Sequence, residues 1–349
     1  MSGGGAPERA LLERPPLEGW SDPPLPCLEE ALAGVRLYHA IVAGLEIGLF
    51  DRLADPMGPG PLAEALGTRE DLTTLLCDAL VSRGVLVREG DCYKNSPKAQ
   101  VFLAKESTYS IRGMIAFYRQ HVERWQDLSR ILREGPVTLR REEFFRRTVI
   151  PSMAEHARCG LLQRVTSLVA TLPGFSEART LLDLAGGHGL YAIAFTALNP
   201  RLSATVFDLP AVTAATRDFI ARYGADRVSV VAGDFNTDPL PGPVDILFSS
   251  SHPGGKDPRL IPKIAAALGP GGLFINKQGR DGTASDPFED LEWNLWTFEG
   301  VQKQRSRYTF THSVPLAEYH RALEEHGLTV LGVIPVDETS EMTVARKDG

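Results

Sequence analysis

Leu181-Leu182-Asp183-Leu184-Ala185-Gly186-Gly187-His188-Gly189-Leu190-Tyr191 is the stretch of sequence that decides the fold. The apolar residues at 180–184 predict a short buried strand, and residues 190–198 predict a helix that packs back on it. The glycines between them let the backbone approach a ligand with no side chain in the way. The helix start adds free N–H groups and the positive end of a dipole. This strand-to-helix turn therefore predicts a site for a nucleotide-like cofactor.

The loop fits two cofactors. Gly187-x-Gly189-x-x-Ala192 matches the dinucleotide fingerprint, and Asp208 follows at about the 20-residue spacing expected of a ribose ligand. Asp183, however, closes the strand directly before the loop. A carboxylate at that position suits a cationic amino group better than a pyrophosphate. The sequence therefore favours S-adenosylmethionine (SAM), and NAD stays open as the alternative.

Composition excludes several classes of protein. The chain has 349 residues, room for two domains, with 43% hydrophobic and 23% charged residues. A net charge of −7 argues against nucleic-acid or anionic-membrane partners. The four cysteines form no C-x-x-C pair, so no metal site or disulfide framework is predicted. We find no signal peptide or membrane-length apolar run, which predicts a cytoplasmic protein.

The N-terminal third predicts a winged helix. Residues 1–27, rich in glycine and proline, predict a flexible leader. Helical periodicity over 28–83, followed by a hairpin signal around 85–93, predicts a winged-helix domain over 28–100. Such a domain either binds DNA as a regulator or mediates dimerisation. The helix that would recognise DNA, 69–83, carries three acidic residues and two basic ones, so it lacks the cationic face that a phosphate backbone needs. This favours dimerisation.

Residues 101–174 predict a helical bridge with an aromatic-rich portion. Most of its large side chains are expected to form interhelical core. Pairs at helical spacing could instead line a pocket for a flat apolar substrate. The candidates for that pocket are Phe117, His121, Trp125, Met153 and His156.

Strand–helix alternation over 175–349 predicts a parallel doubly wound sheet, whose ligands bind beyond the carboxyl ends of the strands. Asp183, Asp208, Asp234 and the run Ser249-Ser250-Ser251-His252 all fall at such ends. Asp208 can accept both ribose hydroxyls, and Asp234 can accept the adenine amino group while Phe235 packs on the ring.

Three segments, Leu182–Gly189, Phe207–Pro210 and Gly233–Phe235, resemble the SAM motifs of the small-molecule O-methyltransferases, the family of plant caffeic acid and hydroxyindole O-methyltransferases. Gly44–Asp51, Ser82–Leu86 and Tyr93–Ser96 resemble its dimerisation domain. The resemblance implies a Rossmann-like class I SAM domain, an all-α winged-helix dimerisation domain, a homodimer, and an acceptor pocket that includes Trp293 and Asn294. The cofactor-binding candidates are Asp183, Gly186, Gly187, Gly189, Asp208, Leu209, Gly233, Asp234, Phe235, Ser249 and Ser250.

The sequence departs from the family pattern at the catalytic step. The family's Leu-His-Asp-Trp signature is absent, and Ser251-His252-Pro253-Gly254 stands near its place. An ungapped alignment puts Ser250 at the family's histidine, whereas a two-residue deletion puts His252 there. Ala185 replaces the first motif glycine, which we expect to be a mild change. Lys277-Gln278-Gly279 replaces an acidic pair, and residues 300–307 lack the glutamate that orients the histidine.

These features predict methyl transfer from SAM to a flat, largely apolar small molecule, at a hydroxyl. A phenol has a pKa near 10, so its methylation benefits from a base, and His252 is the candidate. A solvent-facing turn histidine is an equal interpretation of His252. The alternative function is methylation of carbon or nitrogen, or a non-methylating use of SAM, neither of which needs a base. A DNA-binding regulator is the third.

Overall fold

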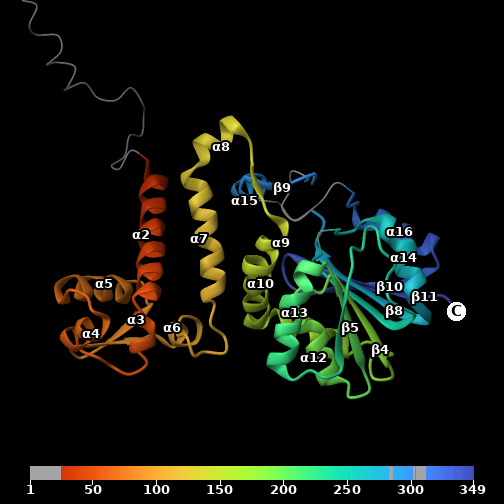
Figure 1. Ribbon diagram of the computed structural model, residues 1–349, viewed down its shortest axis with the longest axis horizontal. Helices are drawn as coiled ribbons and strands as arrows, with labels where there is room; N and C mark the ends of the chain where they lie inside the picture. Colours follow the sequence, from red (N-terminus) through yellow and green to blue (C-terminus); the bar gives the residue numbers. More distant parts are fainter. Residues whose placement is uncertain (1–24, 253, 283–285, 302, 304–311) are drawn as a thin grey trace, which may run out of the picture. The chain divides into compact units, whose positions relative to one another are not determined.

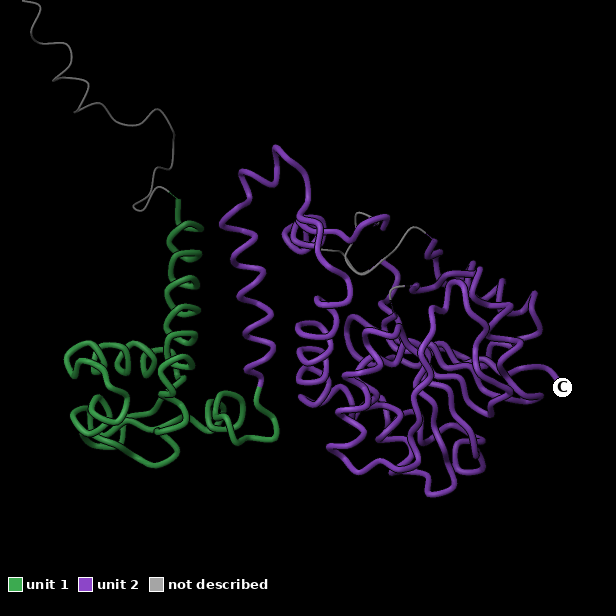
Figure 2. Tube along the Cα trace, in the orientation of Figure 1, with its two compact units in different colours: residues 1–110 green, residues 111–349 purple. Residues whose placement is uncertain are grey.

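The computed structural model describes residues 25–252, 254–282, 286–301, 303 and 312–349. The chain divides into two compact units, Met1–Ser110 and Ile111–Gly349 (Figure 2). Nearly all of the predicted leader, 1–27, lies outside the described residues. The helices predicted to bridge the domains, from α7 onward, belong to the second unit.

The first unit is a winged helix, as predicted. It consists of α2 (Pro26–Glu46), α3 (Leu49–Arg52), α4 (Pro59–Leu66), α5 (Glu70–Ser82), the hairpin β1 (Leu86–Glu89) and β2 (Cys92–Asn95), and α6 (Pro97–Phe102). The hairpin is antiparallel, with Leu86 opposite Asn95. The core of the first unit contains Phe50, Leu62 and Tyr93, which are all fully buried. Gly44 lets α2 approach this core, because a Cβ there would lie 2.9 Å from the ring of Phe50.

Helix α2 has an apolar strip that the described residues leave partly exposed. Leu28, Leu32 and Val35 are 54%, 39% and 51% exposed. Their spacing of four and three residues places them on one face of the helix. On α5, Leu72 and Leu75 are likewise exposed. The unit therefore presents apolar side chains in rows along two helices, a pattern typical of a surface that associates.

The second unit begins with helices that precede the sheet: α7 (Arg112–Gln126), α8 (Leu128–Glu134), the short strand β3 (Val137–Leu139), α9 (Arg141–Phe144), α10 (Ile150–His156) and α11 (Leu162–Ala170). Two single π-helical turns, η1 (Phe145–Val149) and η2 (Ala157–Leu161), separate the last three helices. Pro151 explains the first, because proline lacks the N–H that a regular α-turn needs. Gly160, with φ of 123°, marks the second.

The sheet has seven strands in the order β10-β11-β8-β7-β4-β5-β6 (Figure 1). Five are parallel: β6 (Val228–Ala232), β5 (Ser203–Asp208), β4 (Thr180–Leu184), β7 (Val244–Ser250) and β8 (Leu268–Gly279). The antiparallel hairpin β10 (Leu328–Pro335) and β11 (Ser340–Lys347) extends the sheet beyond β8. Strand order reverses between β4 and β7, which is where a doubly wound sheet opens its ligand crevice.

The remaining elements are α12 (Leu190–Leu198), α13 (Pro210–Tyr223), η3 (Pro258–Leu260), α14 (Ile261–Ala267), α15 (Pro287–Asn294), β9 (Trp296–Phe298) and α16 (Leu316–Glu325). Strand β9 pairs in parallel with β3, so α15 and β9 are tied to the segment that follows α8. None of the helices in the described ranges is long and apolar enough to cross a membrane.

Alternating side chains divide the core between the two faces of the sheet. On one face Leu181 and Ile275 pack with α11 and α12, and on the other Leu182 and Phe274 pack with α14 and α16. Asp183 lies two residues after Leu181 on the same strand, so its side chain lies on the same face as that of Leu181. The predicted strand and helix at 180–184 and 190–198 are confirmed by β4 and α12.

Candidate cofactor and acceptor site

The loop between β4 and α12 needs its glycines for two separate reasons. Gly187 and Gly189 have φ of 56° and 69°, in the left-handed region that favours glycine. Gly186 is required by contact, because a Cβ there would lie 2.5 Å from the carboxyl carbon of Asp183. The hydroxyl of Thr216, on α13, donates to the carbonyl of Gly187 at 2.6 Å and holds the loop from the far side.

The expectation that Ala185 is a mild replacement is wrong. Its φ is 54°, so an L-residue stands in a left-handed conformation where its Cβ crowds the backbone. The amide of Ala185 donates to the carbonyl of Phe207 at 2.8 Å, which fixes this conformation at the end of the strand pair. The loop therefore carries backbone strain that the family's glycine would avoid.

Asp183 is the most unusual group at this edge of the sheet. It is 1% exposed, and neither carboxylate oxygen has a hydrogen-bond partner among the described residues. Burial, and secondly the negative charge of Asp208, raises the pKa of Asp183 to about 7. A buried carboxylate without a partner is costly, and a cationic group placed against it would remove that cost.

Asp208 ends β5 and is already held in place. Its Oδ2 accepts from the amide of Gly187 at 2.8 Å and its Oδ1 from the amide of Leu209 at 2.7 Å. Burial raises the pKa of Asp208 to about 6, although these two N–H groups act in the opposite direction. Each oxygen retains a second lone pair, so the side chain can accept two further hydroxyl donors.

The turn after β6 is shaped by three predicted residues. A Cβ at Gly233 would lie 2.5 Å from the ring of Phe207, so only glycine fits there. The Oδ1 of Asp234 accepts from the amide of Asn236 at 2.9 Å, and Phe235 packs against the core that contains α14. Lys263, on α14, donates to three backbone carbonyls of this turn, those of residues 235, 236 and 238, at 2.9 to 3.0 Å.

The carboxyl end of β7 brings together several polar groups. Ser249 is fully buried, and its hydroxyl has no hydrogen-bond partner among the described residues. Ser250 forms a hydrogen bond with Tyr191, whose pKa burial raises to about 12. On the neighbouring strand, the buried Lys277 donates from Nζ to Oγ of Ser251 at 3.0 Å, and burial lowers the pKa of Lys277. Ser251 has φ of 54°, a second strained position at this edge.

His252 is buried rather than solvent-facing. It is 4% exposed, and its Nδ1 accepts from the amide of Gly254 at 3.0 Å. Its ring meets that of Phe235 edge-on, with centroids 5.4 Å apart. Burial lowers the pKa of His252 to about 4, so the ring is neutral at pH 7. Since Nδ1 accepts a hydrogen bond, the single ring proton lies on Nε2.

An aromatic cluster in the second unit contains some of the residues predicted to bind the acceptor. Phe144, Trp293, Trp296 and Phe298 form its buried core, and Phe117 packs against it. His121 contacts Phe117 edge-on at 4.2 Å between centroids, and its Nδ1 donates to Oε1 of Glu292. The other oxygen of Glu292 accepts from the indole of Trp125 at 3.1 Å.

The other predicted acceptor residues do not join this cluster. Met153 and His156 lie on α10, and both are exposed. Asn294 is exposed at the end of α15, where its amide donates to the carbonyl of Asp290 at 2.7 Å. Their role in acceptor binding stays a prediction.

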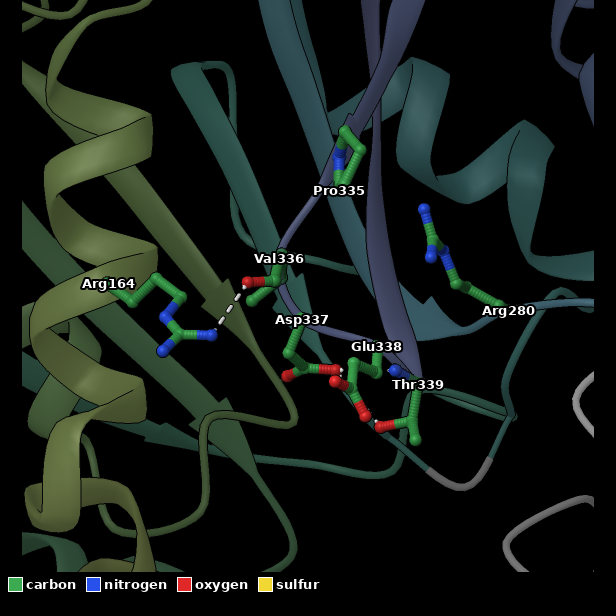
Figure 3. Close-up of a pocket in the computed structure, with 7 residues that line it drawn as sticks. All are labelled: Arg164, Arg280, Pro335, Val336, Asp337, Glu338 and Thr339. Atoms are coloured by element: carbon green, nitrogen blue, oxygen red, sulfur yellow. Dashed lines mark hydrogen bonds between the residues drawn. The ribbon is translucent and has the colours of Figure 1, made fainter.

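A separate hollow of about 630 Å³ lies at the β10–β11 turn (Figure 3). Arg164 and Arg280 stand on either side of it, and residues 335–339 form its floor. The guanidinium of Arg164 donates to the carbonyl of Val336 at 3.1 Å. No residue predicted for cofactor or acceptor binding lines this hollow, so it is distinct from the crevice between β4 and β7.

Comparison with known proteins decides the family. The family model of the O-methyltransferase domain matches residues 138–275, and that of the O-methyltransferase dimerisation domain matches 29–105. The tetracenomycin polyketide synthesis 8-O-methyltransferase of Streptomyces glaucescens is 32% identical over 252 residues, covering 68% of this chain and 73% of the relative. The chain belongs to the O-methyltransferase family.

Two further comparisons extend over most of this O-methyltransferase. An uncharacterised protein of Methanocaldococcus jannaschii is 35% identical over 323 residues, covering 90% of this chain and 87% of that protein. The crystal structure of human N-acetylserotonin methyltransferase, in complex with SAM, has a TM-score of 0.71 at 21% identity and covers 95% of this chain and 100% of that one. The enzyme is thus a SAM-dependent methyltransferase with the family's fold.

The polar groups of this O-methyltransferase fit the cofactor. Asp183 and Ser249 are buried oxygen-bearing side chains without partners in the described part of the chain, and SAM carries an ammonium that a carboxylate can receive. Sequence reasoning missed Lys263 and Glu292, because each acts on residues distant in sequence. For Lys277 there was one signal in the sequence, because Lys277-Gln278-Gly279 stands where the family has an acidic pair.

Proposed function

We propose that this enzyme transfers a methyl group from SAM to a hydroxyl of a flat, largely apolar small molecule. One observation carries the proposal: apolar side chains pack in an unbroken line from the cofactor loop to the aromatic cluster. Ile150 lies 3.3 Å from the position of a Cβ on Gly187, and it packs with Phe145. Phe145 in turn packs against the cluster of Phe144 and Trp296. An acceptor bound against this line of side chains would have its reactive end near the methyl donor.

The chain's own residues supply binding and orientation. Asp183 would receive the cationic amino group of the cofactor, Asp208 the ribose hydroxyls, and Asp234 with Phe235 the adenine. When bound, SAM supplies a methyl group activated by its sulfonium. Nearby apolar side chains exclude water from the acceptor, which strengthens the remaining electrostatic interactions. Two copies of the chain, joined through the dimerisation domain, would form the active protein.

His252 remains the candidate base for a hydroxyl acceptor, and its geometry defines what it must do. The ring is neutral, as a base requires, but the Nδ1 lone pair already accepts from Gly254. The proton would have to move to Nδ1, with loss of that hydrogen bond, before Nε2 could accept a proton. This observation favours a second candidate function: methyl transfer to nitrogen or carbon, which needs positioning but no base.

A comparison of acceptors and variants separates the two functions. The enzyme would be incubated with methyl-labelled SAM and either 2-naphthol or 2-naphthylamine, with products measured by mass spectrometry. If His252 is the base, His252→Ala lowers kcat for the phenol by about 10²–10⁴-fold, and the defect shrinks at high pH. His326→Ala, an exposed histidine after α16, serves as the matched control. An undiminished rate in His252→Ala, with amine methylation, would establish the second function instead.

A further inference from the structure

Arg124 is a buried cation whose hydrogen-bonding edge is unused. It lies on α7, is 8% exposed, and its Nε and Nη2 atoms have no hydrogen-bond partner in the part of the chain that the structure describes. These two atoms stand side by side on one edge of the planar guanidinium. That edge is the one that receives a carboxylate with two parallel N–H···O hydrogen bonds. Leaving both donors buried without acceptors is costly, so the edge is suited to a ligand.

The position of Arg124 links it to the acceptor side. Phe117, His121 and Arg124 are spaced by four and three residues, so they share one face of α7. Phe117 packs against the aromatic cluster, and His121 contacts Glu292. The negative charge of Glu292 also opposes the lowering of the pKa of Arg124 by burial. Arg124 therefore lies on the helix face that carries Phe117, which packs against the cluster that the proposed acceptor would contact.

The described charged groups around Arg124 include a second basic side chain. Lys303 lies over the rings of Trp293 and Trp296, with Nζ 4.0 and 3.1 Å from their centroids. Burial, and secondly the positive charge of Arg124, lowers the pKa of Lys303 to about 7, while burial lowers that of Arg124. Two basic groups, of which Arg124 is buried, thus lie near the carboxylate of Glu292.

Glu123, the other carboxylate that acts on Arg124, leaves the Nε–Nη2 edge without a hydrogen bond among the described residues. It is exposed, and its Oε1 lies 3.6 Å from Nε of Arg119. An additional anion beside Arg124 would neutralise the group and satisfy both unused donors. A planar carboxylate matches the fork in shape as well as in charge.

We propose that Arg124 binds a carboxylate of the methyl acceptor, and that the acceptor is therefore a flat aromatic acid rather than a neutral aromatic compound. This inference rests on the proposed function, which it makes more specific. The aromatic body of the acceptor would pack on the cluster of Phe117, Phe144 and Trp296, and its carboxylate would anchor the end remote from the methylated group. Arg124 would determine specificity and take no part in the chemical step.

The test compares acids with their amides. The full-length protein, saturated with S-adenosylhomocysteine (SAH), would be titrated calorimetrically with 6-hydroxy-2-naphthoate, 7-hydroxyquinoline-3-carboxylate and 6-hydroxyanthracene-2-carboxylate, each beside its primary amide. We expect at least one acid to bind ten times or more as tightly as its amide. In Arg124→Gln that preference should vanish while amide affinity is unchanged, and Arg124→Lys, which keeps the charge but not the fork, should retain part of it. No preference for any acid, or a preference that survives in Arg124→Gln, overturns the inference.

Stability provides a second test that needs no ligand. If Arg124 serves an absent carboxylate, replacing it by a methionine of similar length removes a buried, unsatisfied cation. Arg124→Met should then unfold at the same temperature as the wild type or higher. A fall of more than about 5 °C would identify Arg124 as a structural residue and overturn the inference.

Failure of this inference can be told apart from failure of the proposed function. Methylation of neutral naphthols without any preference for acids contradicts the role of Arg124 and leaves hydroxyl methylation intact. Binding of acids through Arg124 without an O-methylated product supports the carboxylate site and contradicts hydroxyl methylation.

Discussion

Replacing Asp183 by asparagine tests the central feature of the site. The folded-state pKa of about 7 lies above the ordinary value of 3.8, by roughly three units. Each unit is about 1.4 kcal/mol, so the ionised carboxylate costs the folded protein about 4 kcal/mol. Because the folded pKa is raised, this cost is absent below pH 4 and grows as the pH rises toward 7. Replacement by asparagine removes this cost, but the amide, which also lacks a partner there, destabilises the folded protein by about 1–3 kcal/mol.

We therefore expect cofactor-free Asp183→Asn to be more stable than the wild type at pH 8. At pH 4.5, where the wild-type carboxyl is mostly protonated, the variant should be as stable as the wild type or less stable. Denaturant unfolding at the two pH values measures the difference. Asp208→Asn is the control, since its oxygens hold the amides of Gly187 and Leu209 and its loss should destabilise the protein at pH 8.

Cofactor binding gives the same variant a second readout. An ammonium placed against Asp183 should drive the carboxyl to its ionised form, so SAH binding at pH 7 should release about half a proton. Calorimetry in two buffers of different ionisation enthalpy measures this release. We expect it to disappear in Asp183→Asn, together with a loss of affinity. Unchanged SAH affinity, or a variant less stable than the wild type at pH 8, would refute the reasoning.

Three further substitutions test the scaffold of the site. Ala185→Gly should stabilise the protein by up to about 1 kcal/mol in denaturant unfolding, since the relieved left-handed strain exceeds the added flexibility of glycine; destabilisation would contradict the strain. Lys263→Met should weaken SAH binding and lower the free energy of unfolding by about 2 kcal/mol, because three carbonyls lose a charged donor; the exposed Lys98→Met is its control, and equal behaviour of the two variants would exclude the role of Lys263. Gly233→Ala should greatly reduce SAH affinity in calorimetry, since its Cβ would displace the ring of Phe207; normal affinity would count against this turn as the adenine site.

Local sequence signals predicted the strand β4, the glycine loop and the helix α12 well, because such signals are dense there. The run from Leu181 to Tyr191 combines an apolar strand, glycines and a helix start, and each part is a short-range property of the chain. The acids after β5 and β6 could be placed with the same logic, since parallel strands end at one edge. The conformation of Ala185 was missed, because alanine gives no sign that its φ must be positive.

The contacts around the aromatic cluster could not be predicted in the same detail. His121 and Glu292 are 171 residues apart in sequence, and neither residue is marked by a local pattern. Their contact exists because the β3–β9 pairing ties α15 to the segment after α8, and two three-residue strands leave almost no periodicity. The hairpin β10–β11 was likewise unpredicted, since an edge addition to a parallel sheet is not implied by the strands before it.

The apolar strip on α2 has a consequence for how the enzyme's stability should be measured. Leu28, Leu32 and Val35 remain 39% to 54% exposed among the described residues of their own chain. If a second copy covers them, part of the free energy of unfolding belongs to association and depends on protein concentration. The midpoint of thermal unfolding should then rise with each tenfold increase in concentration. Comparisons between the variants above are meaningful only at one fixed concentration of protomer.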